Sequence, residues 1–333
     1  MESPENPPAA VHVIVPAYNA GWSIPDTIRS ILVQTFANFL VTIVDDGSTE
    51  ELAPVLNPLI GADPRFRVVR QRNEGLASAR NRGLAEVRSP FVAFLDSDDV
   101  WHPDFLNRLL PALRTEAAAP FAYVHSYRFD GENRLIPAPR WRYKPRHDLV
   151  GLLTLNTVAS GSASVFRTEA IRAVGGFDPS LRTRRAEGAE DWKLTLRLAA
   201  TATPVLVPDY LAAYRLIERS MSQSDPARQL RAVRMVMEDL RAELRDVPER
   251  GICNARTAMN GWLLGAFLRK GEYLTAVSLL VESYLRNPFW FATRELRTIH
   301  AMKIGTILMD RGPRVHMADL LEPDGRRPFA FLR

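Results

Sequence analysis

The chain has 333 residues, 46% hydrophobic and 24% charged, with a formal net charge of +5. This is the composition of an ordinary globular protein, and the scattered Lys and Arg do not form the basic blocks of a nucleic-acid binder. The chain contains no run of 18 or more apolar residues, so a transmembrane helix is not expected. It has a single cysteine, Cys253, so an internal disulfide is not expected.

Strand and helix patterns alternate over the first 115 residues. After a predicted disordered leader (1–10), apolar β-branched runs predict buried strands at 11–16, 39–44, 65–69 and 91–95. Helical patterns follow them from Ile24 to Leu32, with Ser23 as the N-cap, and at 50–60, 75–87 and 103–115. This alternation predicts a doubly wound α/β sheet, in which ligands bind at the carboxyl ends of the strands.

The pattern changes after residue 120. Further strands are predicted at 121–129, 161–166 and 204–208, a Pro- and Arg-rich loop at 136–147, and a helix at 190–200. From about 225 to 333 the chain is predicted to be helical. Residues 255–288 resemble one tetratricopeptide-like hairpin, but a plain helical hairpin is the alternative, because repeat arrays need about three or more copies.

Three carboxylates, Asp96, Asp98 and Asp99, follow the strand at 91–95. Carboxylates are the ligands that Mg²⁺ and Mn²⁺ prefer, so a metal site is one interpretation. The alternative is that an Asp here caps the next helix. The sequence of this segment alone leaves both interpretations open.

Two other strand ends carry polar residues that would lie at the same edge of the sheet. Asp45 and Asp46 precede Gly47 and Ser48, and Pro16, Ala17, Tyr18 and Asn19 end the first strand. The glycine permits a tight turn and close approach of a ligand, but an ordinary Asp-Gly turn is an equal alternative.

Five segments occur in an order and spacing that is far more specific than any one of them. They are "VIVPAYNA", "IVDDGSTE", "RNEGLASARNRGL", "FVAFLDSDD" and "GAEDWKLTLRLA". Together they resemble the inverting glycosyltransferases of family 2, over residues 10 to 220. The resemblance implies a GT-A fold, a Rossmann-like mixed sheet forming a catalytic domain at 11–222, followed here by the helical region at 225–333.

The resemblance also implies roles for individual residues. The donor nucleotide would be held by Pro16, Ala17, Tyr18, Asn19, Asp45, Asp46, Arg80, Asp96 and Ser97. Asp98 and Asp99 would bind Mn²⁺ or Mg²⁺, and Asp191 would be the general base. Glu190, Trp192, Ser162 and Arg215 would lie near the acceptor or the diphosphate, with 214–223 as a mobile loop; the His that many members carry in this loop is absent.

Sugar transfer requires the chemistry that these residue types supply. A cation neutralises the leaving diphosphate, and a carboxylate removes the proton of the acceptor hydroxyl. Asp191 begins the predicted helix at 190–200, so the helix N-terminus is expected to lower its pKa and keep it anionic.

The implied donor is a nucleotide sugar, with UDP favoured, and the implied acceptor is a saccharide or a lipid-linked saccharide. A cytoplasmic location, extending to the inner face of the membrane, is expected. Residues 286–300 combine Arg with aromatic residues, which leaves peripheral membrane contact and a homodimer open. The alternatives are a nucleotidyltransferase, although a Gly-rich phosphate loop is missing after the first strand, and a non-catalytic helical scaffold.

Overall fold

The computed structural model describes residues 9–61, 63–136, 146–158, 160–217, 225–244, 247, 249–289 and 315–332. Three predicted features lie partly outside the described residues: the leader (1–8), the loop at 136–147 (137–145) and the mobile loop at 214–223 (218–223). Residues 290–300, most of the predicted interface segment, also lie outside them.

An eight-stranded mixed sheet, in the order β3-β2-β1-β4-β7-β6-β8-β5, forms the centre of the fold. The first four of these strands are mutually parallel: β1 (Val11–Ala17), β2 (Phe39–Asp45), β3 (Phe66–Arg70) and β4 (Phe91–Phe94). β7 (Ser164–Arg167) runs antiparallel to β4 and to β6 (Phe121–Phe129). β8 (Val205–Arg215) is parallel to β6, and the short β5 (Val100–Trp101) lies at the edge. The predicted mixed α/β sheet is confirmed.

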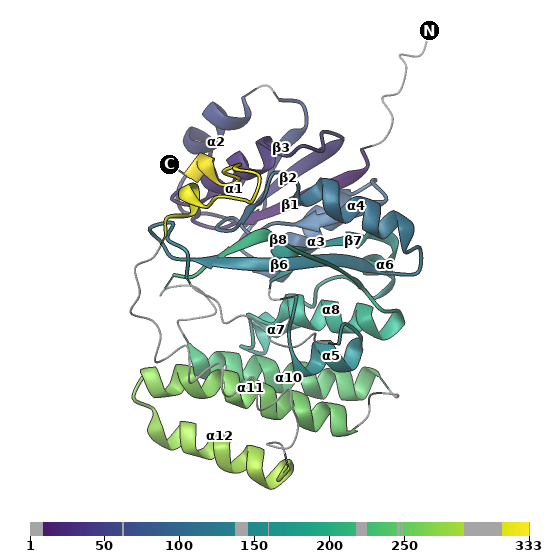
Figure 1. The fold of residues 1–333 in the computed structure, drawn as a ribbon, viewed down its shortest axis with the longest axis vertical. Helices are drawn as coiled ribbons and strands as arrows, with labels where there is room; N and C mark the ends of the chain where they lie inside the picture. The colour runs from purple at the N-terminus through teal and green to yellow at the C-terminus, as the bar shows by residue number, and fades with distance from the viewer. Residues whose placement is uncertain are drawn as a thin grey trace.

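Helices cover both faces of the sheet, as two apolar strand faces require. Val13 and Ile14, neighbours in β1, are fully buried in two different apolar clusters, because successive side chains of a strand point to opposite faces. One cluster contains residues of α1 (Ile24–Leu32), α2 (Ala53–Ile60) and α4 (Phe105–Thr115). The other contains residues of α3 (Leu76–Glu86), α5 (Leu149–Thr154), α6 (Thr168–Ala173), α7 (Ser180–Thr183) and α8 (Glu190–Thr201) (Figure 1).

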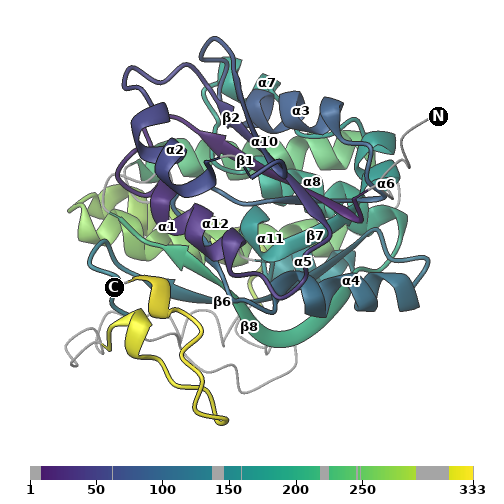
Figure 2. The same ribbon diagram turned by 90° about the horizontal axis from the view of Figure 1, so that it is seen from above.

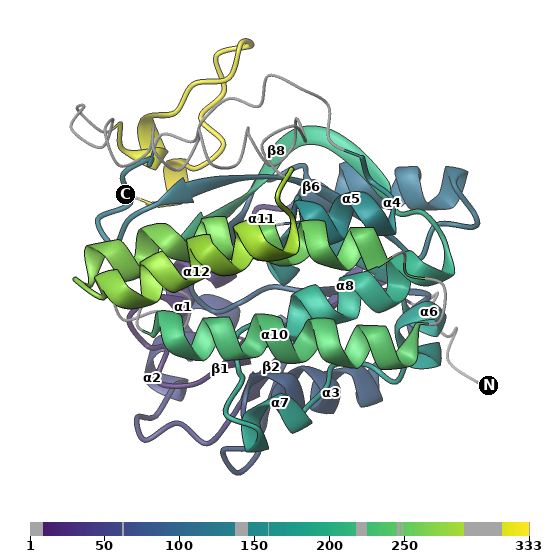
Figure 3. The same cartoon turned by 90° about the horizontal axis from the view of Figure 1, so that it is seen from below.

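Three long helices lie below α8: α10 (Pro226–Glu243), α11 (Glu249–Arg269) and α12 (Tyr273–Arg286) (Figures 1 and 3). The Asp225 side chain caps α10 by accepting a hydrogen bond from the backbone N–H of Arg228. A short turn joins α11 to α12, so a helical hairpin is present where one was predicted. Gly271 in this turn has φ 74°, a conformation that glycine adopts readily after a helix. No described helix is both long and apolar enough to cross a membrane.

Local structure differs from the predictions at four places. The Ser23 hydroxyl does not cap α1; it donates to the carbonyl of Ala20. Gly161–Ala163 form a 3-10 helix before β7, where a strand was predicted from residue 161. The strand predicted at 204–208 is longer, and β8 continues to Arg215. The helix α5 and the two-residue strand β5 are too short for periodicity to show.

The tail at 315–332 was predicted to be helical, and this prediction is wrong. It contains only two short 3-10 turns. It returns to the eight-stranded sheet and lies beside β6 and β8 (Figures 1 and 2). Phe329 and Met317 are fully buried there, in one cluster with Val100, Phe129 and Ala213. The tail therefore packs against the eight-stranded sheet, although it follows the helices α10–α12 in the chain.

Candidate active site

The carboxyl ends of β1, β2 and β4 lie at one edge of the sheet, as parallel pairing predicts. Ala17 pairs with Asp45, and the Asp46 N–H donates to the Ala17 carbonyl at 2.8 Å. The Leu95 N–H donates to the carbonyl of Ile14 at 3.0 Å, which places the start of the Asp96–Asp99 turn beside β1. The predicted strand-end residues are thus brought together.

Asp46 holds the loop that leads into α3. Its Oδ1 accepts hydrogen bonds from Gln71 Nε2 at 2.8 Å and the Glu74 N–H at 2.9 Å, and its Oδ2 accepts from the Gly75 N–H at 2.8 Å. Asp45 accepts from the Ser48 N–H at 2.9 Å and closes the turn. Both carboxylates are buried, so in this structure they shape the loops around the edge of the sheet.

The residues after β1 are tied to this turn. Asn19 has φ 49°, in the left-handed region, and its Oδ1 accepts from the Thr49 N–H at 2.8 Å. Gly47 has φ 74°, and a Cβ there would come within 2.7 Å of a backbone nitrogen, so glycine is required. Pro16 and Ala17 are buried, whereas Tyr18 is 51% exposed, so its aromatic ring is accessible to a ligand.

The turn from Asp96 to Asp99 is closed by a hydrogen bond from the Asp99 N–H to the Asp96 carbonyl at 3.1 Å. Asp99 is buried, and its carboxylate accepts from the Arg215 N–H at 3.0 Å and from Ser160 Oγ at 3.3 Å. Burial, together with the charges of Asp98 and Asp96, raises the pKa of Asp99 well above its ordinary value. Asp99 does not cap the following helix in this arrangement.

Asp98 and Ser97 are half-buried at the tip of this turn. Burial and the charge of Asp96 raise the pKa of Asp98 to about 6, against the opposing effect of Arg215. Among the described residues no group of three or more His, Cys, Asp or Glu side chains converges on a metal position. The carboxylate of Asp98 is a hard oxygen donor, the kind that Mg²⁺ takes one or two of, together with the oxygens of a ligand.

Arg80, on α3, is a fully buried cation between the carboxylates. Its Nη2 donates to Asp96 Oδ1 at 2.6 Å, and its guanidinium lies 5.0 Å from the centre of the Phe177 ring. Burial alone would lower the pKa of Arg80, but the charges of Asp96 and Asp191 outweigh it and raise the pKa. Its Nε has no hydrogen-bond partner within the described structure.

Asp191, in the first turn of α8, faces the 3-10 helix at Gly161–Ala163. Its Oδ2 accepts from the Gly161 N–H at 3.0 Å, and its Oδ1 accepts from the Trp192 N–H at 2.7 Å. The expectation that its pKa is lowered is wrong: burial raises it, with a contribution from Asp96 against the opposing charge of Arg80. The helix terminus fixes the carboxylate, but removal from water dominates its protonation.

The residues around Asp191 are buried and are held by contacts within the protein. Glu190 is buried, its carboxylate accepts from the Gly188 N–H, and burial raises its pKa. Trp192 is buried in the apolar cluster beneath the sheet. The hydroxyl of Ser162 accepts from the Asp96 N–H at 3.1 Å and links the 3-10 helix before β7 to the acidic turn. Neither Glu190 nor Trp192 is open to an acceptor in this arrangement.

Two residues that anchor this region were missed from the sequence. Gly161 lies against Asp191 and Arg80: a Cβ on it would be 3.4 Å from the Cβ of Asp191 and 3.8 Å from Arg80 Nη2. The small-residue segment "SGSAS" was the only signal for it.

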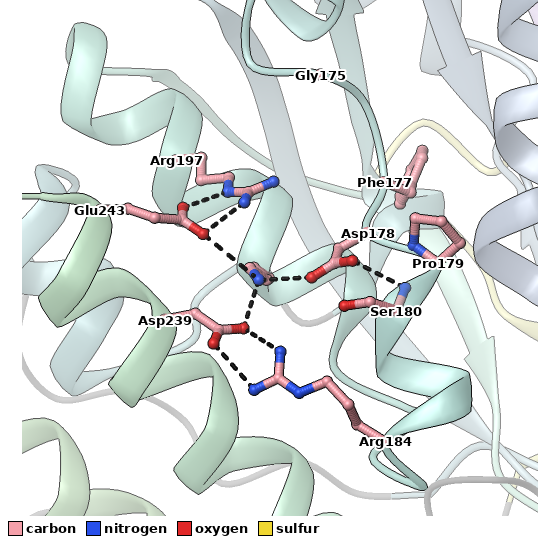
Figure 4. Close-up of a pocket in the computed structure, with 10 residues that line it drawn as sticks. Gly175, Phe177, Asp178, Pro179, Ser180, Arg184, Arg197, Asp239 and Glu243 are labelled. Atoms are coloured by element: carbon pink, nitrogen blue, oxygen red, sulfur yellow. Dashed lines mark hydrogen bonds and ion pairs between the residues drawn. The ribbon is translucent and has the colours of Figure 1, made fainter.

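The second is Lys193, two residues after Asp191. It is buried, and its Nζ lies 2.6 Å from Asp178 and 2.5 Å from Asp239. These groups line a cavity of about 330 Å³ below α8, where Figure 4 shows Arg184 with Asp239 and Arg197 with Glu243. The acidic and basic side chains around the cavity are paired with one another, and these ion pairs connect α8 to α10. It shows no unbalanced charge that would bind a ligand.

Comparison with known proteins gives matches to glycosyltransferases. The Glycosyl transferase family 2 model matches residues 12–175. A putative teichuronic acid biosynthesis glycosyltransferase of Bacillus subtilis, TuaG, is 31% identical over 221 residues, which cover 64% of this chain and 82% of TuaG. A chondroitin synthase of Escherichia coli is 28% identical over 190 residues, 57% of this chain and 26% of that protein. An uncharacterized glycosyltransferase of Rickettsia felis is 43% identical over 95 residues, but the match spans only 15% of its length.

Solved structures share the fold at low sequence identity. Staphylococcus aureus TarS 1-349, in complex with UDP-GlcNAc, aligns with a TM-score of 0.60 and 18% identity over 89% of this chain and 88% of that one. The mannosyltransferase PcManGT of Pyrobaculum calidifontis, in complex with GDP-Man and Mn²⁺, aligns with a TM-score of 0.57 and 19% identity over 93% and 92% of the two chains.

Proposed function

The chain belongs to glycosyltransferase family 2, and on this premise we propose that it transfers a sugar from a nucleoside diphosphate sugar to a hydroxyl acceptor. The observation that carries the proposal is the arrangement around Arg80, which pairs with Asp96 at 2.6 Å and lies beside Asp191 across Gly161. An acidic turn at the strand ends and a separate buried carboxylate are the two parts that inverting transfer needs.

Donor binding is assigned to the edge formed by β1, β2 and β4. Tyr18 would stack on the base, while Asp46 and Asn19 keep the surrounding loops in place. UDP is the favoured nucleotide, which the UDP-GlcNAc complex of the TarS fold relative supports. Asp98 is the carboxylate that would hold Mn²⁺ or Mg²⁺, since those of Asp96 and Asp99 already accept hydrogen bonds from other residues. A cation bound there would offset the charge of the leaving diphosphate.

Asp191 is the proposed general base. Each of its oxygens accepts one backbone hydrogen bond, which fixes the carboxylate plane and leaves further lone pairs for an acceptor hydroxyl. Its raised pKa makes it a stronger base than an exposed Asp, as removal of a proton from an acceptor hydroxyl requires.

The acceptor is proposed to be a saccharide or lipid-linked saccharide in the synthesis of a cell-surface polysaccharide or glycolipid. The names of two relatives, which refer to teichuronic acid biosynthesis and to chondroitin synthesis, support a polysaccharide. A cytoplasmic location next to the membrane would follow from such an acceptor.

The test is a screen of nucleotide sugars with Mn²⁺, read as released nucleotide, beside thermal shifts with UDP, GDP and dTDP with and without Mn²⁺. The Asp191→Asn variant is expected to lose about 10²- to 10⁴-fold in turnover while it keeps stabilisation by the nucleotide. Glu169→Gln, an exposed carboxylate in the first turn of α6, is the matched control and should be unchanged. Near-normal turnover of Asp191→Asn would remove the base assignment, and no response to any nucleotide would count against the donor class.

A further inference from the structure

Arg215, the last residue of β8, was expected near the diphosphate or the acceptor, but its side chain is only 3% exposed. Its Nε donates to the Asp98 carbonyl at 2.9 Å, and its backbone N–H donates to the Asp99 carboxylate at 3.0 Å. Its Nη2 donates to Asp26 at 2.9 Å, and its Nη1 donates to Asn133 Oδ1 at 2.6 Å. All three guanidinium nitrogens are therefore engaged inside the protein.

Two aromatic rings complete the enclosure of this guanidinium. The ring centre of Phe129 is 4.4 Å from its central carbon, and that of Trp22 is 5.7 Å away. Arg215 thus holds two consecutive residues of the acidic turn from one side, through the backbone of Asp98 and the carboxylate of Asp99. It leaves the Asp98 carboxylate at the tip, where the donor is proposed to bind.

Asn133 connects this arginine to the C-terminal tail. It has φ 58°, and while its Oδ1 accepts from Arg215, its Nδ2 donates to the Leu332 carbonyl at 3.2 Å. Its own carbonyl accepts from the Met317 N–H at 2.7 Å. The tail has a second anchor close to the acidic turn, where His102 Nε2 lies 3.0 Å from Glu322 Oε1.

We propose that Arg215 is a positioning residue that fixes the Asp98–Asp99 turn, and that Asn133 keeps its guanidinium in place. The consequence for donor binding rests on the proposed function, but the ordering of the turn by Arg215 and Asn133 does not. A loosened turn presents Asp98 in several positions, so a loss of order at the turn should weaken nucleotide binding more than it weakens the global fold.

Substitution at Asn133 tests this without removing a buried charge. Asn133→Gly suits the positive φ and loses both side-chain contacts, whereas Asn133→Asp keeps an oxygen for Arg215 and loses only the donor to the tail. Hydrogen–deuterium exchange of free protein is read in peptides spanning 96–101 and 315–332. Asn133→Gly should raise exchange about tenfold in both, because a hydrogen bond to a charged group is lost. Asn133→Asp should raise it in the tail peptide alone.

The control is Asn287→Gly, which removes a side-chain amide contact with Asn254 at the end of α12 and should leave both peptides unchanged. Wild-type exchange at 96–101 in Asn133→Gly would overturn the proposal. So would equal loosening of that peptide by Asn133→Asp, because the tail contact and not Arg215 would then hold the turn.

A second experiment measures the binding of UDP in the presence of Mn²⁺. Asn133→Gly should raise the half-saturating UDP concentration about tenfold, and Asn133→Asp should restore it, a pattern that general destabilisation would not produce. The exchange arm needs no nucleotide, so its outcome stands even if the wild type binds none and the proposed function fails. Unchanged UDP affinity in an Asn133→Gly variant with a loosened turn would overturn the role in donor binding.

Discussion

His12, the second residue of β1, makes the stability of the sheet depend on pH. Its side chain is 4% exposed and its Nε2 lies 2.7 Å from Thr42 Oγ1. Burial first, and the Arg67 guanidinium second, lower its pKa from 6.5 to about 4, against a smaller opposing effect of Glu86. The folded state thus keeps this ring neutral at pH values where the unfolded chain protonates it.

The sign and size of the effect follow from that difference. A lowered His pKa gives stability that is fully present above pH 6.5 and is lost as the pH falls toward 4. At pH 5 the unfolded ring is almost fully protonated and the folded ring almost fully neutral. The free energy of unfolding should therefore fall by about 2 kcal/mol between pH 7 and pH 5 through this residue alone.

Urea unfolding at pH 7, 6 and 5 measures this loss for the wild type and for His12→Gln. The Gln amide can still reach Thr42 but does not titrate, so the variant should lose about 2 kcal/mol less stability over the interval. All other titrating groups are shared, and they cancel in the difference. Equal losses in the two proteins would show that the buried ring is not kept neutral by its surroundings.

Three further outcomes are expected. Asp98→Ala should abolish the Mn²⁺ dependence of nucleotide binding in thermal-shift titrations, whereas Asp99→Ala should chiefly lower the melting temperature; the reverse result would exchange the two assignments. Lys193→Met should lower the free energy of unfolding by about 3 kcal/mol in urea, because it removes the buried ammonium that pairs with the half-buried Asp178 and Asp239, and a change under 1 kcal/mol would contradict this. Phe329→Ala should cost about 3–5 kcal/mol, because it empties a fully buried site between the tail and β5, and a tail that docks only loosely would show almost no loss.

The framework of the catalytic domain could be predicted from residue patterns alone. Apolar β-branched runs specified β1, β2 and β4, and because parallel strands end at the same edge, their last residues placed Tyr18, Asp46 and Asp96 together. The same local rules failed where competing contacts decide the outcome. Ser23 has the identity of an N-cap, but its hydroxyl donates to the Ala20 carbonyl.

The behaviour of the charged groups of the site depends on the folded chain and could not be predicted from the sequence. The sequence placed Asp191 at a helix N-terminus, which lowers a pKa, but burial beneath the sheet raises it. It placed Arg215 near the diphosphate or the acceptor through the family resemblance, and only the fold shows that the guanidinium is buried beside Phe129 and Trp22, against the acidic turn. It gave no sign that the tail at 315–332 returns to β5, since that contact joins segments over 200 residues apart in the chain. Burial and long-range contact depend on the whole fold, and no local pattern encodes them.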